Sequence, residues 1–234
     1  MTVSRALEHT VRTDLSLPDS VPIAVVNMGL AAATFHPDPD AREKLRLDPG
    51  ERIVLFAGNL THGKGVDVLL DAFITVLDEG FADRLVLIGT GPLEGELRHS
   101  IGMTVDDYAH ADATDKVTFT GRLSQRDLAL WMAAADVFVL PSRAEGLGLV
   151  TLEAMACGTP CVGTAIGGIP EVLDAPACGR LVPPDDAAAL SSAIADVIAS
   201  GKVSYEAACL SQAAAHTADA KASEMISAIR GVLE

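Results

Sequence analysis

Positive charge is scarce in this sequence, and lysine is scarcer still. The 234 residues include 17 lysines and arginines, of which five are lysines, against 32 aspartates and glutamates. The net charge is −15. Nucleic acids and anionic membrane surfaces bind proteins that present basic patches. The charge balance therefore argues against both as partners.

Paired cysteines are absent too. The chain has four cysteines, Cys157, Cys161, Cys178 and Cys209, and none shows the CxxC spacing of a structural zinc site. No sequence cluster of His, Asp and Cys typical of a metal site appears elsewhere. We interpret the four cysteines as reduced core thiols in a reducing cytosol.

Long apolar runs are also missing. No stretch approaches the roughly 18 consecutive apolar residues that a membrane span needs. Met1 is followed by Thr-Val-Ser-Arg, and not by the charged and apolar regions of a secretory signal. We therefore expect a cytoplasmic protein without a membrane span in this chain. Membrane association through a part of the protein outside this chain stays an alternative.

Apolar runs typical of strands alternate with helical patterns along most of the chain. The expected helix over 66–77 has apolar residues at spacings of three and four, and another helix is expected over 123–135. The strands are expected within 51–57, 84–88, 115–121, 136–141 and 160–164. This alternation predicts an α/β fold with a parallel sheet and helices on both faces.

Several candidate ligand-binding residues follow the ends of these strands. Gly58, Gly89 and Gly121 come at or directly after a strand end, and Glu145 lies in the turn after the strand over 136–141. In open parallel sheets, ligands bind in the crevice beyond the carboxyl ends of the strands. The sequence therefore predicts a ligand site at this edge of the sheet.

The segment 141–160 carries the strongest signal. Glu145 lies between a strand and a helix, and Glu153 lies within that helix. Gly146 and Gly148 allow the backbone to approach a ligand closely. The free N–H groups at the start of the helix favour an anion. Two carboxylates and an anion-binding helix end are therefore expected at one site.

These motifs resemble the donor-site signature of retaining glycosyltransferases of the GT-B fold, family 4 type. The matching residues are Pro141-Ser142, Glu145-Gly-x-Gly148 and the run Glu153-Ala-Met-Ala-x-Gly158-x-Pro160. The Gly63-Lys64-Gly65 turn and the later glycine turns follow in the family's order, so the resemblance covers residues 21–200. It implies a Rossmann-like, nucleotide-sugar-binding domain over 23–200 and C-terminal helices over 201–234.

The resemblance also implies roles for individual residues. Lys64 would stabilise the diphosphate of the donor. Glu145 would contact the sugar hydroxyls or the charge that develops near the anomeric carbon, and Glu153 would accept hydrogen bonds from the ribose hydroxyls. A carboxylate suits both tasks because it can accept two hydrogen bonds from neighbouring hydroxyls. The backbone amides that would assist Lys64 belong to Leu147, Gly148 and Leu149.

Other implied site residues follow the first and third strands. Gly58 and Asn59 would lie near the diphosphate, and the family usually has an arginine where this chain has Asn59. The diphosphate site is therefore expected to have one positive charge fewer than is usual in the family. Gly121, Arg122 and Leu123 would border the base. The donor would be a UDP-, GDP- or ADP-sugar, with no metal and no other cofactor.

The resemblance further implies that the acceptor binds to an N-terminal domain missing from this chain. Residues 1–22 would be a remnant of that domain or a linker, and this chain alone would be inactive. The preferred function is hexose transfer to a glycan, lipid or small molecule. Another GT-B enzyme, such as an epimerase or a phosphorylase, and a non-catalytic nucleotide-sugar-binding subunit stay open. Gly167 and Gly168 either line the sugar pocket or form a simple turn.

Overall fold

A six-stranded parallel sheet forms the centre of the computed structural model, which describes residues 1–107 and 113–233. The strands are β1 (Ile53–Ala57), β2 (Arg84–Ile88), β3 (Val117–Gly121), β4 (Val137–Leu140), β5 (Cys161–Thr164) and β6 (Gly179–Val182). Their order is β3-β2-β1-β4-β5-β6. All residues of β1 and β4 are buried, as expected for strands covered on both faces. The predicted α/β class is confirmed.

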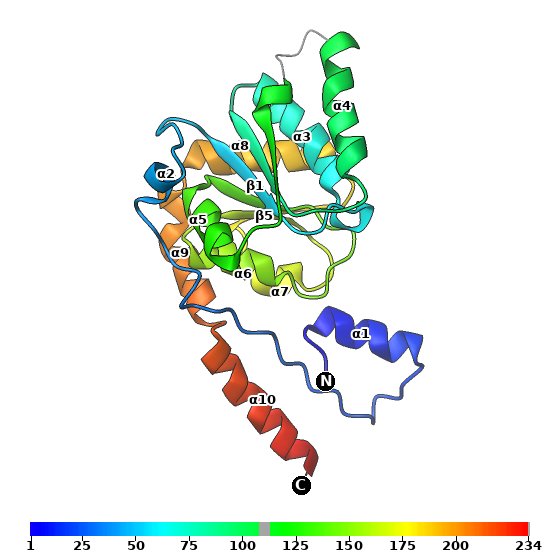
Figure 1. The fold of residues 1–234 in the computed structure, drawn as a ribbon. Helices are drawn as coiled ribbons and strands as arrows, with labels where there is room; N and C mark the ends of the chain where they lie inside the picture. The colour runs from blue at the N-terminus through cyan, green and yellow to red at the C-terminus, as the bar shows by residue number, and fades with distance from the viewer. Residues whose placement is uncertain (108–112, 234) are drawn as a thin grey trace.

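Helices cover both faces of this sheet (Figure 1). One face carries α3 (Val66–Asp78), α4 (Glu94–Asp107) and α8 (Ala187–Ser200). The other face carries α5 (Gln125–Ala134), α6 (Leu149–Ala156), α7 (Ile169–Val172) and α9 (Val203–Ala214). The apolar stripe expected for 66–77 faces inward, because Val66, Leu69, Leu70 and Phe73 are buried in α3.

The strand β3 and the helix α5 each begin two residues later than expected, and a local hydrogen bond explains the start of the helix. The helix expected from residue 123 begins at Gln125, because the Ser124 hydroxyl accepts a hydrogen bond from the Asp127 amide and caps the helix there. The strand expected from residue 115 begins at Val117, after a short 3₁₀ turn over Ala113–Lys116.

The two ends of the chain lie outside the sheet layers. Figure 1 shows α1 (Arg5–Asp14) below α7, and α10 (Ala218–Leu233) projecting away from the body. A small helix, α2 (Ala41–Lys44), lies in the connection between α1 and β1. The Glu171 carboxylate accepts hydrogen bonds from the first two amides of α1, at 3.1 Å each. The start of the chain is therefore tied to α7.

The buried interior accounts for the cysteines. All four cysteines are buried and none forms a disulfide, which agrees with the interpretation as reduced core thiols. No helix in the described part of the chain is both long and apolar enough to cross a membrane.

Candidate functional site

A cavity of about 490 Å³ opens beyond the carboxyl ends of the strands. It lies where β1 has β2 on one side and β4 on the other, the point at which the strand order reverses. Ligands of open α/β sheets bind at such a point, and the volume falls in the usual range for small-molecule sites. The residues that line it are Ala57, Gly58, Asn59, Lys64, Ile88, Gly89, Thr90, Arg122, Leu123, Leu128, Glu145, Gly148, Leu149 and Val150.

Lys64 reaches this cavity from a short 3₁₀ turn, His62–Lys64, between β1 and α3. Gly65 ends the turn with a φ of +64°, a conformation that side chains disfavour. A Cβ atom at Gly65 would lie 2.0 Å from the carbonyl oxygen of Pro141. The turn therefore rests directly on the end of β4, and this contact brings Lys64 close to the Glu145 turn.

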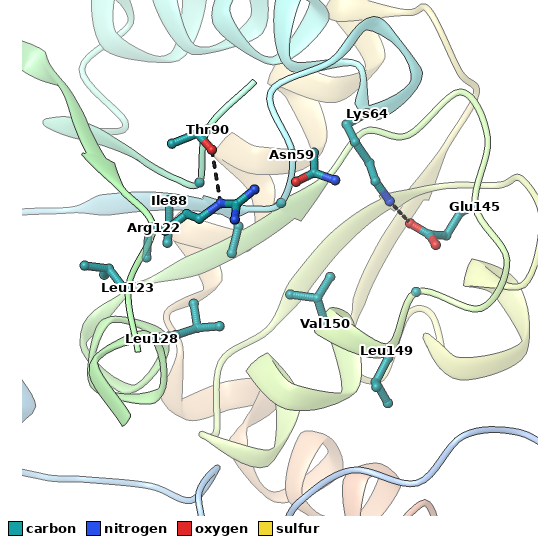
Figure 2. A pocket seen from close by; sticks show the side chains of 14 residues that line it. Asn59, Lys64, Ile88, Thr90, Arg122, Leu123, Leu128, Glu145, Leu149 and Val150 are labelled. Carbon is teal, nitrogen blue, oxygen red and sulfur yellow. Dashed lines mark hydrogen bonds and ion pairs between the residues drawn. The ribbon is translucent and has the colours of Figure 1, made fainter. Parts of the chain in front are cut away.

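Lys64 and Glu145 form an ion pair in the cavity, as Figure 2 shows. The Lys64 ammonium donates to Oε2 of Glu145 at 2.6 Å, and the Glu145 side chain is only 14% exposed. Oε1 of Glu145 accepts a hydrogen bond from the Gly146 amide at 3.1 Å. The sequence motifs placed both residues at a ligand site, but they gave no sign that the two would neutralise each other.

The start of α6 forms the next wall of the cavity. Gly148 caps the helix and Leu149 is its first residue, so the amides without an intrahelical partner lie at the cavity edge. Gly148, Leu149 and Val150 line the cavity. Leu147 is buried in the core and Gly146 lies outside the cavity lining. A role for their amides stays a prediction.

The far end of the cavity is mostly apolar. Leu123, Leu128 and Val150 lie around it, and the Nε of Arg122 donates to the Thr90 hydroxyl at 3.2 Å (Figure 2). Asn59 lies between Arg122 and Lys64 in the same view. An apolar region beside charged groups suits a ligand with an aromatic base at one end and anionic groups at the other.

Glu153 lies in the middle of α6 and is outside the cavity lining. Burial in apolar surroundings raises the pKa of its carboxyl to about 7. Its ribose role therefore stays a prediction, as does a base contact by Gly121, which also lies outside the lining.

Sequence reasoning missed several lining residues. Ile88 and Thr90 flank Gly89 at the end of β2, so the strand-end rule that selected Gly89 also covers them. Leu128 and Val150 look like ordinary apolar helix residues, and only the fold brings them to the cavity.

Within residues 1–107 and 113–233, no group of three His, Cys, Asp or Glu side chains is placed to hold a metal ion. The expectation of a metal-independent site stays a prediction, because nucleotide phosphates can themselves supply metal ligands.

The sequence matches known proteins over most of its length. The family described as glycosyl transferases group 1 matches residues 51–200. The D-inositol 3-phosphate glycosyltransferase of Mycolicibacterium vanbaalenii is 37% identical over 229 residues, which cover 91% of this chain and 50% of that protein. The chain thus spans about half the length of the curated relatives it matches.

Solved structures show the same fold. A sucrose-phosphate synthase from Thermosynechococcus elongatus aligns with a TM-score of 0.84 and 30% identity, over 99% of this chain and 57% of that one. The HepE protein of Anabaena, solved in complex with UDP, aligns with a TM-score of 0.82 and 21% identity, over 98% of this chain and 63% of that one. The chain therefore belongs to the glycosyl transferases group 1 family and has the Rossmann-like fold of GT-B glycosyltransferase C-terminal domains.

Proposed function

We propose that this chain is the donor-binding part of a retaining glycosyltransferase that moves a hexose from a nucleoside diphosphate sugar to an acceptor. The observation that carries the proposal is the cavity at the strand-order reversal, where Lys64, Glu145 and the start of α6 come together. HepE has been solved with UDP and with UDP-glucose, which supports the same class of donor here.

The diphosphate of the donor would lie against Lys64 and the first amides of α6. Charge grows on the leaving diphosphate as its bond to the anomeric carbon breaks, and a cation and a helix N-terminus both stabilise that charge. The base would occupy the apolar end of the cavity, beside Leu123 and Leu128. Asn59 lies where the family usually has an arginine, so Lys64 would supply a larger share of the positive charge that stabilises the diphosphate.

The sugar would lie beside Glu145. When the diphosphate replaces Glu145 as the ion-pair partner of Lys64, the Glu145 carboxylate becomes available for the sugar. It can then accept hydrogen bonds from sugar hydroxyls or stabilise positive charge at the anomeric carbon. The acceptor hydroxyl would attack the same face of that carbon and pass its proton to the leaving phosphate oxygen. No protein nucleophile and no metal are needed for this route.

Binding and transfer assays test the proposal together. Calorimetric titration of the chain with UDP, GDP and ADP should identify one preferred nucleotide. Transfer from the matching sugar donor should be absent with this chain alone and should appear when the remaining half of a full-length relative is supplied. Binding without transfer in the combined system would favour the non-catalytic subunit. The absence of any nucleotide binding by the folded chain would reject the proposal.

A further inference from the structure

Arg143 contacts the turn that carries Lys64, yet it is outside the cavity lining. It follows β4 and belongs to the same turn as Glu145. Neither the sequence motif nor the proposed mechanism gives it a role. Its side chain is 29% exposed and donates hydrogen bonds to three other residues.

Backbone and side chain of Arg143 both bind the Lys64 turn. The amides of Arg143 and Ala144 donate to the carbonyl oxygen of Gly63, at 2.9 and 3.3 Å. The guanidinium donates to the carbonyl oxygen of His62 at 2.6 Å. The residues immediately before Lys64 are therefore tied to the residues immediately before Glu145.

Two aspartates hold the guanidinium in this place. Asp67, in the first turn of α3, accepts two hydrogen bonds from Arg143 at 2.8 Å each. Asp185, in the loop between β6 and α8, accepts a further one from Nε. A guanidinium matches a carboxylate in this two-point geometry, and a lysine ammonium cannot reproduce it. The guanidinium nitrogens thus donate to Asp67, Asp185 and His62, and none of these three residues lines the cavity.

We propose that Arg143 is a positioning residue that fixes the Lys64 turn against the Glu145 turn. The 2.6 Å approach of Lys64 to Glu145 needs both turns in place, and so does a diphosphate that is to lie between Lys64 and α6. The role rests on the proposed donor site. It differs from direct phosphate binding, the task that an additional arginine near an anion would otherwise have.

Nucleotide affinity of three variants tests this role. Arg143→Gln and Arg143→Lys should each weaken binding of the preferred nucleoside diphosphate about tenfold, as expected when one charge-assisted contact is displaced. Both should leave binding of the bare nucleoside unchanged. Asp67→Asn should also weaken diphosphate binding, because it releases Arg143 from its position. If Arg143 were a direct phosphate ligand, Asp67→Asn would free it and tighten binding.

Matched controls separate position from charge. Arg126→Gln removes an arginine from the exposed side of α5, and Asp71→Asn removes an acid one turn further along α3 from Asp67; neither should reproduce the losses. Asp185→Asn should weaken diphosphate binding less than Asp67→Asn does, because Asp185 accepts one hydrogen bond from Arg143 and Asp67 accepts two. Asparagine also tolerates the positive φ of 58° at this position.

Hydrogen exchange tests the proposal without any ligand. The Ala144 amide should lose protection in Arg143→Gln and keep it in Arg126→Gln. A wild-type chain that binds no nucleotide would reject the proposed function, while the exchange result would still decide the positioning role. Unchanged protection, or wild-type diphosphate affinity in Arg143→Gln, would overturn the inference alone.

Discussion

Lys64 forms an ion pair with Glu145 in the cavity, so a bound diphosphate has to displace the Glu145 carboxylate from the ammonium. We predict that Lys64→Ala weakens binding of the nucleoside diphosphate by about ten- to a hundredfold, the equivalent of one charge-assisted hydrogen bond of about 1.5–3 kcal/mol. Binding of the bare nucleoside should not change. Calorimetry with both ligands measures this, and Lys44→Ala at the exposed end of α2 is the control. Equal losses for both ligands would remove Lys64 from the phosphate site.

Glu145→Gln should have the opposite effect on the same ligand. The substitution removes a carboxylate that both repels the diphosphate and competes for Lys64, so a bare nucleoside diphosphate should bind more tightly than to the wild type. Transfer by the completed enzyme should fall, because the amide cannot stabilise positive charge at the anomeric carbon. Weaker diphosphate binding in the folded variant would show that the ion pair helps to form the site instead of opposing the ligand.

Glu153 provides a prediction about pH. Because burial raises the pKa of its carboxyl in the folded chain to about 7, against 4.5 for a free glutamate, folding favours the protonated form. The protonated Glu153 carboxyl therefore stabilises the folded chain fully below pH 4.5, and this stabilisation is lost as the pH rises through 7. The free energy of unfolding in urea should therefore rise for Glu153→Gln relative to the wild type as the pH increases from 4.5 to 7.

The control for that measurement is Glu79→Gln at the exposed end of α3, which should leave the pH dependence unchanged. If ribose hydroxyls donate to the Glu153 carboxylate, nucleotide binding near pH 7 should also release protons, and the apparent enthalpy should then vary with the buffer. Identical pH curves for the wild type and Glu153→Gln would contradict a raised pKa at this residue.

The sequence could identify most single residues of the cavity but not their contacts with each other. Lys64 and Glu145 stand out because a Gly-Lys-Gly turn and a Glu-Gly-x-Gly turn each follow a strand end. Their mutual ion pair joins residues 81 positions apart, and the bonds from Arg143 to Asp67 span 76 positions. Local sequence patterns do not show which distant residues come into contact, so these interactions could be identified only from the three-dimensional structure.

At the scale of elements, two loops meet through their backbones. A Cβ at Gly167 would lie 1.9 Å from the carbonyl oxygen of Glu145, and Gly167 has a φ of +56°. This contact favours the structural turn among the two interpretations of Gly167. We predict that Gly167→Ala costs more than about 1 kcal/mol of stability and also reduces nucleotide binding, because the Glu145 turn has to move.

Gly95→Ala is the matched control. Gly95 lies in α4 with no atom within 4 Å of its would-be Cβ, so alanine there should stabilise the chain by up to about 1 kcal/mol. Denaturant unfolding compares the two variants. A neutral effect of Gly167→Ala on both stability and binding would show that the loop can separate from the Glu145 turn.

Strands and helices with continuous or periodic apolar residues were the easiest elements to predict. The predicted strand over 84–88 agrees with β2 residue for residue, and the helix predicted over 66–77 differs from α3 by one residue at its end. The short elements α2, α7 and β6 and the 3₁₀ turn at His62–Lys64 lack such patterns and were not predicted. The 3₁₀ turn, for example, accepts hydrogen bonds from Arg143 and Ala144, which are distant in the sequence.

At the scale of the whole molecule, the exposed apolar side chains are unevenly distributed. Among the described residues, α10 carries Met225, Ile226 and Ile229 at 40, 51 and 47% exposure. Figure 1 shows this helix projecting from the body. Helical spacing places Ile226 next to Ile229 on its surface, so α10 presents an apolar stripe to solvent. Soluble proteins tend to cover such stripes through contacts with other chains or domains.

We therefore predict that the isolated 234-residue chain self-associates and that α10 mediates the contact. Sedimentation velocity should show a sedimentation coefficient that rises with protein concentration, and the double variant Ile226→Gln and Ile229→Gln should abolish the rise. Glutamine preserves helix propensity, so the helix should persist. Val203→Gln is the control, since Val203 is 84% exposed but lies at the start of α9. A monomeric wild type, or equal association of the double variant, would contradict the prediction, and the stripe would then be tolerated in water without a partner.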